Sequence, residues 1–212
     1  MTLNGRNLPG NLLILVASAL MPAMAAEQEI AFTLGRISGS DRSLSSIAGN
    51  AANLKFAAGT ALQANYARRF LSLPFADLFG EVHFLASPQE RIASGIGAVT
   101  RDVATLYVTP GVRLKFLPGR KLSPWVAGGA GYSLYEQSTV TISGAANTAP
   151  RHTSGIAVQF GGGVDLKILP HLALRAEIRE FYSGSPAFNL PVTGTGQLHT
   201  VAGGGIVLRF GR

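Results

Sequence analysis

The segment VATLYVTPGVRLKFLPGRKLSPWVAGGAGYSLY, residues 103–135, decides the predicted fold. Its first half places Leu106 and Leu114 on one face of an extended chain and Arg113 and Lys115 on the other. Such an alternation with a period of two indicates a β-strand with two unlike faces. A turn containing proline and glycine follows, and the alternation then resumes. Strands of this length suit a tilted membrane crossing of about 9–11 residues. The segment therefore predicts a long β-hairpin.

The same pattern recurs along the rest of the chain and predicts eight strands. The connections between them alternate in length. The long ones are residues 38–53, 87–101, 137–154 and 183–197, and the short ones are residues 71–75, 117–124 and 170–171. In an antiparallel meander, alternate connections lie at opposite ends, so all long loops share one end. Barrels of the bacterial outer membrane have this layout. The predicted fold class is all-β, an eight-stranded antiparallel up-and-down transmembrane β-barrel.

The alternation does not by itself show which face is inside, because a soluble lipocalin-type barrel also alternates. The apolar faces contain no carboxylate and almost no base, as expected where a charge against lipid costs about 2–4 kcal/mol at the midplane. Aromatic residues near strand ends suggest two interfacial girdles. These are Phe70, Phe75, Phe116, Trp125 and Phe210 beside the short turns, and Phe84, Tyr135, Phe181 and Tyr182 beside the long loops. Together these features favour the membrane arrangement.

The polar faces carry charges of both signs, which can pair inside a lumen just wide enough for side chains to fill. The sequence predicts a structural network of lumenal charges, formed by Arg69, Glu81, Arg113, Asp165, Lys167, Arg175, Glu177, Arg179 and Arg209. Lys55, Lys115 and Asp77 are also placed inward, so that bases outnumber acids. A salt-bridge network explains such an interior better than a conducting pore does.

The N-terminus and the composition limit the cellular location. An apolar run too short to span a membrane ends in a small-residue cleavage site, so residues 1–25 are predicted to be a signal peptide and residues 26–212 the barrel. The 212 residues include no cysteine, which excludes disulfides, thiolate metal sites and lipoprotein acylation. The net charge of +7 is not gathered into long basic runs, so nucleic-acid binding is not expected.

The segment WVAGGAGYSLY, residues 125–135, and the closing GGGIVLRF, residues 203–210, resemble the outer membrane protein β-barrel domain family. That family is related in architecture to the transmembrane domain of OmpA and to OmpX. The resemblance implies a location in the outer membrane of a Gram-negative-type bacterium and recognition by the barrel-assembly machinery. The family's last strand usually ends on an aromatic residue, whereas here Phe210 is followed by Gly211 and Arg212.

No motif in the sequence demands catalysis. We expect a non-enzymatic protein without metal or cofactor, monomeric in outer-membrane lipid, that is structural or interacts through its external loops with a ligand that the sequence does not identify. A narrow solute channel or porin-like protein and a loop-mediated adhesin are alternatives. A lipid A-modifying hydrolase is a further alternative. His152 and Ser154 resemble part of the His-x-Ser-Asn segment of a lipid A deacylase, but Gly155 replaces its Asn, and Glu177 and Glu180 are the downstream acids.

Overall fold

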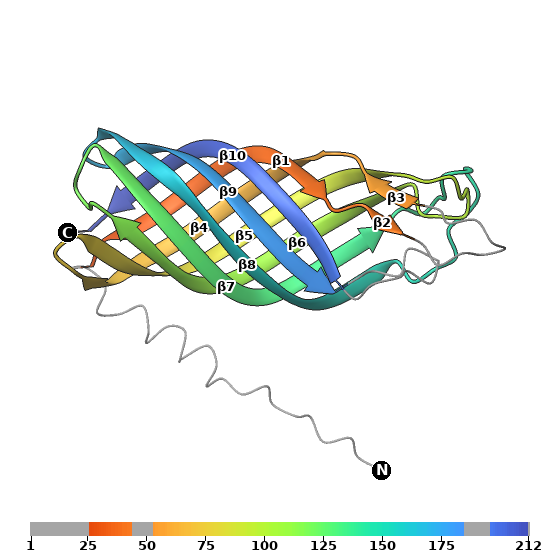
Figure 1. Ribbon diagram of the computed structural model, residues 1–212, viewed down its shortest axis with the longest axis horizontal. Coiled ribbons are helices and arrows are strands. Elements are labelled where there is room, and N and C mark those ends of the chain that lie inside the picture. Colours follow the sequence, from red (N-terminus) through yellow and green to blue (C-terminus); the bar gives the residue numbers. More distant parts are fainter. Residues whose placement is uncertain (1–25, 44–52, 185–195, 212) are drawn as a thin grey trace, which may run out of the picture.

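The computed structural model describes residues 26–43, 53–184 and 196–211 (Figure 1). The predicted signal peptide lies outside the described residues. The strands are β1 (Gln28–Gly39), β2 (Arg42–Ser43), β3 (Asn53–Phe56), β4 (Gly59–Ser72), β5 (Ala76–Ala93), β6 (Asp102–Phe116), β7 (Leu122–Gln137), β8 (His152–Leu169), β9 (Leu172–Gly184) and β10 (Gly196–Phe210). In the described part of the chain, no helix is both long and apolar enough to cross a membrane.

Eight of these strands form a closed antiparallel ring, which confirms the predicted fold class. The ring runs in the order β5-β4-β1-β10-β9-β8-β7-β6 and closes through the pairing of β5 with β6. Following paired residues once round the ring from Gln28 leads back to Ser38, a shift of ten residues. For eight strands this shift implies a tilt of about 40° to the barrel axis. Strands tilted in this way bring residues far apart in sequence to one height in the lumen.

The short connections and the C-terminus gather at one end of the barrel, while β2, β3 and the longer loops lie at the other (Figure 1). The predicted loop 87–101 is shorter than expected, because β5 continues to Ala93. A bulge between Ser87 and Glu90 lets the strand resume its pairing with β6. The barrel wall therefore extends toward the loop end beyond the predicted membrane crossing.

The interior is polar and the exterior is apolar, as the membrane arrangement requires. Arg113, Asp165 and Arg179 are fully buried inside the ring, whereas Ile156 is 78% exposed on its outer face. A soluble barrel would have the opposite arrangement. The outer face is less purely apolar than predicted, because Arg36 is exposed and Glu180 is half-buried on it.

Four predictions for single side chains are wrong. Trp125, Tyr135 and Phe181 are buried in the lumen, so they do not belong to interfacial girdles. Each one shares its direction with inward residues two positions away along its strand. Lys55 is exposed, not inward, because residues 57–58 break the strand and shift the alternation between β3 and β4.

Candidate functional site

The lumen near the short-turn end is organised around the carboxylate of Glu29 on β1, which is completely buried. Its Oε1 lies 2.5 Å from Nζ of Lys115 and 3.2 Å from Nε of Arg209. Its Oε2 accepts a hydrogen bond from Arg113 and lies 3.6 Å from Nη2 of Arg175. These four bases come from β6, β9 and β10. One carboxylate therefore ties four strands of the ring together across the lumen.

Two further carboxylates extend the contacts. Asp165 on β8 accepts hydrogen bonds from Nε and Nη2 of Arg175, at 2.8 and 3.0 Å. Glu81 on β5 accepts a hydrogen bond from Nη1 of Arg179 at 2.8 Å and lies 3.7 Å from Nε of Arg113. The connected network contains four acids and five bases: Glu29, Glu81, Asp165, Glu177, Arg113, Lys115, Arg175, Arg179 and Arg209. Its formal charges nearly cancel.

The indole of Trp125 forms an aromatic centre for the same network. Its Nε1 donates to Asp165 at 3.2 Å. The guanidinium carbons of Arg175, Arg179 and Arg113 lie 4.8, 4.9 and 5.7 Å from the centre of its ring. Cation–π contacts of about 2 kcal/mol are typical where the cation has lost its water. Trp125 therefore partly offsets the burial of three cations, which explains its inward position.

The structure brings seven of the nine predicted lumenal charges into this network. The other two, Arg69 and Lys167, lie at the mouth of the lumen beside the short turns, where they line a cup of about 360 Å³. Nη1 of Arg69 is 2.9 Å from Glu27 and 3.2 Å from Asp77. Lys167 is half-buried and has no ion pair within the described part of the chain.

Glu29 is the important residue that the sequence reasoning missed. Its position could have been found, because it shares the direction of Ala31 and Thr33 along β1. Its partners could not, because they lie on strands whose relative heights depend on the ten-residue shift of the ring.

A neutral polar layer lies above the charges. Thr33 donates to Glu177 at 2.6 Å and accepts from Gln63 at 2.9 Å. The side-chain amide of Asn65 and Nδ1 of His83 are buried and have no protein partner among the described residues. Buried polar atoms of this kind are ordinarily satisfied by internal water. We expect a few ordered water molecules in this layer.

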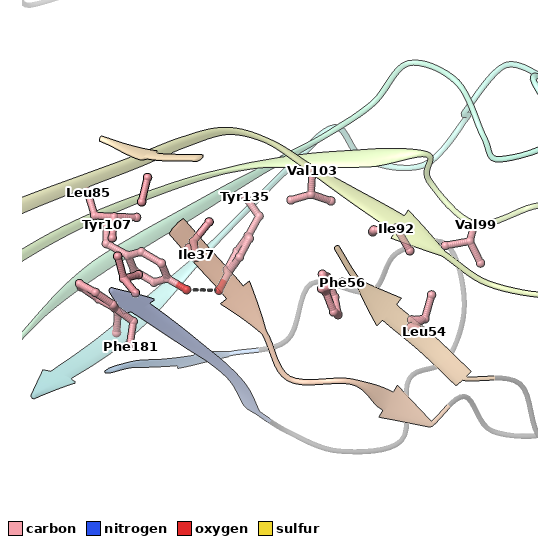
Figure 2. Close-up of a cluster of buried hydrophobic side chains, with 13 residues drawn as sticks. Ile37, Leu54, Phe56, Leu85, Ile92, Val99, Val103, Tyr107, Tyr135 and Phe181 are labelled. Atoms are coloured by element: carbon pink, nitrogen blue, oxygen red, sulfur yellow. Dashed lines mark hydrogen bonds between the residues drawn. The ribbon is translucent and has the colours of Figure 1, made fainter. Parts of the chain in front are cut away.

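Toward the loop end, a chain of buried hydrogen bonds crosses the lumen. The hydroxyl oxygen of Tyr107 is 2.5 Å from that of Tyr135 (Figure 2). It is 2.8 Å from Nδ1 of His199. Nε2 of His199 is 3.4 Å from Glu90, which accepts a hydrogen bond from Thr105 at 2.9 Å. Every one of these residues is at most 3% exposed. This row of hydrogen-bonded side chains contains groups used in catalysis elsewhere, but the row has no access to bulk solvent in this structure.

Apolar side chains close the lumen on the loop side of these hydrogen bonds (Figure 2). Leu54 and Phe56 of β3 pack with Ile92 and Val99. The ring of Phe56 meets the ring of His199 edge-on, with 6.2 Å between the ring centres. The short strand β3 pairs with β5 outside the main ring. Strand β3 therefore contributes to the apolar cluster that closes the loop end.

The second and third long connections, residues 94–101 and 138–151, are joined by backbone hydrogen bonds and form a loop platform outside this seal. Ile142 N donates to Val99 O at 2.9 Å, and Ser143 N donates to Gly97 O at 3.0 Å. Small side chains surround a hollow of about 570 Å³ between the two segments.

The residues of the possible lipid A hydrolase are not brought together. His152 begins β8 with its side chain exposed to solvent. Glu180 pairs with Phe160. Phe160 lies eight residues beyond His152 along β8, which places Glu180 about 26 Å from His152. Glu177 lies farther still and is bound to Thr33 within the lumen. The geometry gives this arrangement no support.

Comparison with known proteins shows the fold. No protein-family description matches the sequence. No functionally curated protein matches it either. Among solved structures, Neisserial surface protein A aligns over 86% of this chain and 97% of its own, at 11% identity and a TM-score of 0.54. OprG of Pseudomonas aeruginosa aligns over 90% and 98%, at 13% identity and a TM-score of 0.51. AlkL, determined in lipid bilayers, aligns over 100% and 98%, at 14% identity and a TM-score of 0.50.

These similarities confirm the predicted resemblance to small outer-membrane barrels at the level of the fold. The fold and the apolar exterior together support the predicted location in the outer membrane and contact with its lipid.

The Glu29 carboxylate tests the importance of the network. Replacing Glu29 with Gln removes the negative charge that four buried cations share. We therefore expect the free energy of unfolding to fall by about 3–5 kcal/mol. Urea unfolding in detergent micelles measures the change.

Glu27→Gln is the matched control. Glu27 has the same side chain two residues earlier but is about a quarter exposed in its pair with Arg69. Its loss should cost less than about 1 kcal/mol. Equal effects of the two substitutions would show that the network does not depend on Glu29.

Proposed function

We propose that the protein is a non-enzymatic, non-conducting outer-membrane barrel that acts through its extracellular end. The observation that supports this proposal is that the lumen is filled at two separate levels. A buried ion-pair network fills it near the short turns, and an apolar cluster fills it near the loops. An ion would have to displace both fillings, so the interior supports a scaffold better than a channel.

The filling also explains why the interior is charged at all. Removing one partner of a buried ion pair is strongly destabilising, by about 3–5 kcal/mol, because the other charge stays buried alone. Here the pairs Glu29–Arg113 and Glu81–Arg179 join strands that are not neighbours in the ring, so these pairs are satisfied only when the ring is complete. The network thus favours a rigid barrel with one strand register, which is a suitable support for loops.

The remaining parts of the proposal concern assembly. The side chain of Phe210, at the end of β10, is 46% exposed on the barrel exterior. An exposed aromatic residue there is accessible to the barrel-assembly machinery. We take the mature protein to be a monomer, because each of the eight strands in the closed ring is paired on both sides and offers no edge to a second copy.

Conductance of planar lipid bilayers tests the closed lumen. We expect no discrete current steps in molar KCl from the wild-type protein. Lys167→Gln removes a cation from the mouth without touching the filling, so it should also be silent. Discrete steps in the wild-type protein, with a size that changes in Lys167→Gln, would show that ions pass the mouth and would favour the channel alternative.

The loop platform favours a second candidate function, that of a loop-mediated adhesin. Its two segments are joined by backbone hydrogen bonds, and Thr141 N donates to Ala145 O at 2.9 Å within the third connection. A surface whose loops are held by hydrogen bonds loses less conformational entropy on binding than a flexible surface does. The platform is therefore the part of the described loop end best prepared to bind a partner.

Replacing residues 139–149 with a short Gly-Ser linker tests this role. We expect the barrel to remain folded, with an unchanged heat-dependent shift in gel mobility, because no member of the lumenal network lies in this segment. Purified wild-type protein in nanodiscs should bind components of an extracellular-matrix and glycan array that the linker variant does not bind. Binding that the replacement leaves intact would exclude the platform as the adhesive surface.

A further inference from the structure

The lipid-facing surface of the barrel is hollowed into an apolar groove that runs from β10 across β1 and β4 to β5, with a volume of about 620 Å³. Ala64 lies between Phe32 and Phe84 in the strand pairing. In the next row, Ala86 lies beside Leu62. Paired residues project from the same face of a sheet. The small side chains therefore form the floor of the groove and the larger ones its walls.

A cation lies at the extracellular end of this groove. Arg36 follows the wall residue Leu34 by two positions on the outer face of β1 and is exposed. It pairs with Thr60 of β4, whose side chain is also exposed on that face. Arg36 has no ion pair within the described part of the chain. A guanidinium and a hydroxyl thus stand together where the apolar surface ends.

The nearby carboxylate does not occupy the same place. Glu180 pairs with Thr200, and Arg36 pairs with Ala202 on the same strand, β10. Glu180 therefore lies two strands from β1, about 10 Å away at the usual strand spacing. The groove extends from β1 in the opposite direction, toward β4 and β5. On that side its paired residue is Thr60 of β4.

The occupant follows from the surroundings of the groove. In a membrane barrel this belt faces acyl chains, so the groove is filled by a hydrocarbon chain. Arg36 lies on the loop side of the belt, at the level of the lipid head groups. A guanidinium pairs strongly with phosphate and a hydroxyl can donate to it. Acyl chain and phosphate in this relative position belong to one molecule, a phosphate-bearing lipid of the outer leaflet.

We propose that the groove binds an acyl chain of a phosphorylated outer-leaflet lipid, whose phosphate is held by Arg36 and Thr60. The site is on the outside of the barrel, so it is independent of the closed lumen and of the loop platform.

Native mass spectrometry of the purified protein can count retained lipid molecules. The probes are bisphosphorylated lipid A and the same molecule after enzymatic removal of its phosphates. We expect Arg36→Gln to weaken retention of the phosphorylated probe about tenfold, the usual effect of one lost charge-assisted hydrogen bond. Retention of the dephosphorylated probe should not change. Lys121→Gln, the same charge change on the exposed short turn, is the matched control and should behave as the wild-type protein.

A second pair of variants tests the groove itself. Ala64→Leu fills its floor and should lower retention of both probes. Ala130→Leu is the same substitution at an exposed outer position of β7, outside the groove, and should have no effect. All four variants are first checked for the heat-dependent shift in gel mobility. Equal retention of the two probes by the wild-type protein would overturn the proposal, as would equal losses in Arg36→Gln and Lys121→Gln, or in Ala64→Leu and Ala130→Leu.

Discussion

The rest of the structure depends on the pairing of one buried carboxylate, Glu29, with four basic side chains. Charges removed from water cost several kcal/mol each unless they are paired with good geometry. In this lumen the pairs join β1 to β6, β9 and β10, which are distant in sequence. Strand β6 is not a neighbour of β1 in the ring, so Glu29 meets its two partners on β6 only after the ring has closed. Any other register would separate the partners, so the network selects the observed closure.

The same network determines what the interior can do. Trp125 stacks with three guanidinium groups, and the polar layer above it is bounded by the Tyr107–Tyr135 hydrogen bond. Beyond this lies the apolar cluster that includes Leu54 of β3. With its centre filled in three successive layers, the barrel has its accessible chemistry at the surface. We therefore propose that recognition takes place at the loop platform and at the lipid-facing groove.

The sequence predicted the strands, their alternation and the inward direction of Arg113, Arg175 and Arg179, because a period of two determines the face of every residue within an unbroken strand. It failed where the strand breaks, as at Lys55. The prediction was also wrong for Trp125, which was placed at the membrane interface because it is aromatic, although the alternation along its strand directs it inward. The ion pairs could not be predicted, because they depend on the ten-residue shift, which is a property of the closed ring and not of any one strand. The role proposed for Arg36 could not be predicted either, because it depends on the groove beside this residue, which the sequence does not show.

Thiol reactivity in lipid bilayers tests most directly the claim that the lumen is sealed and the exterior faces lipid. The natural chain has no cysteine, so single cysteines report one position each. Ser133 and Ala157 point inward and are nearly fully buried, whereas Val158 and Phe160 are exposed on the outer face. Cysteines at 158 and 160 should react with a lipid-soluble maleimide but not with a charged aqueous methanethiosulfonate, and cysteines at 133 and 157 should react with neither. Rapid reaction of the inward cysteines with the charged reagent would contradict the account.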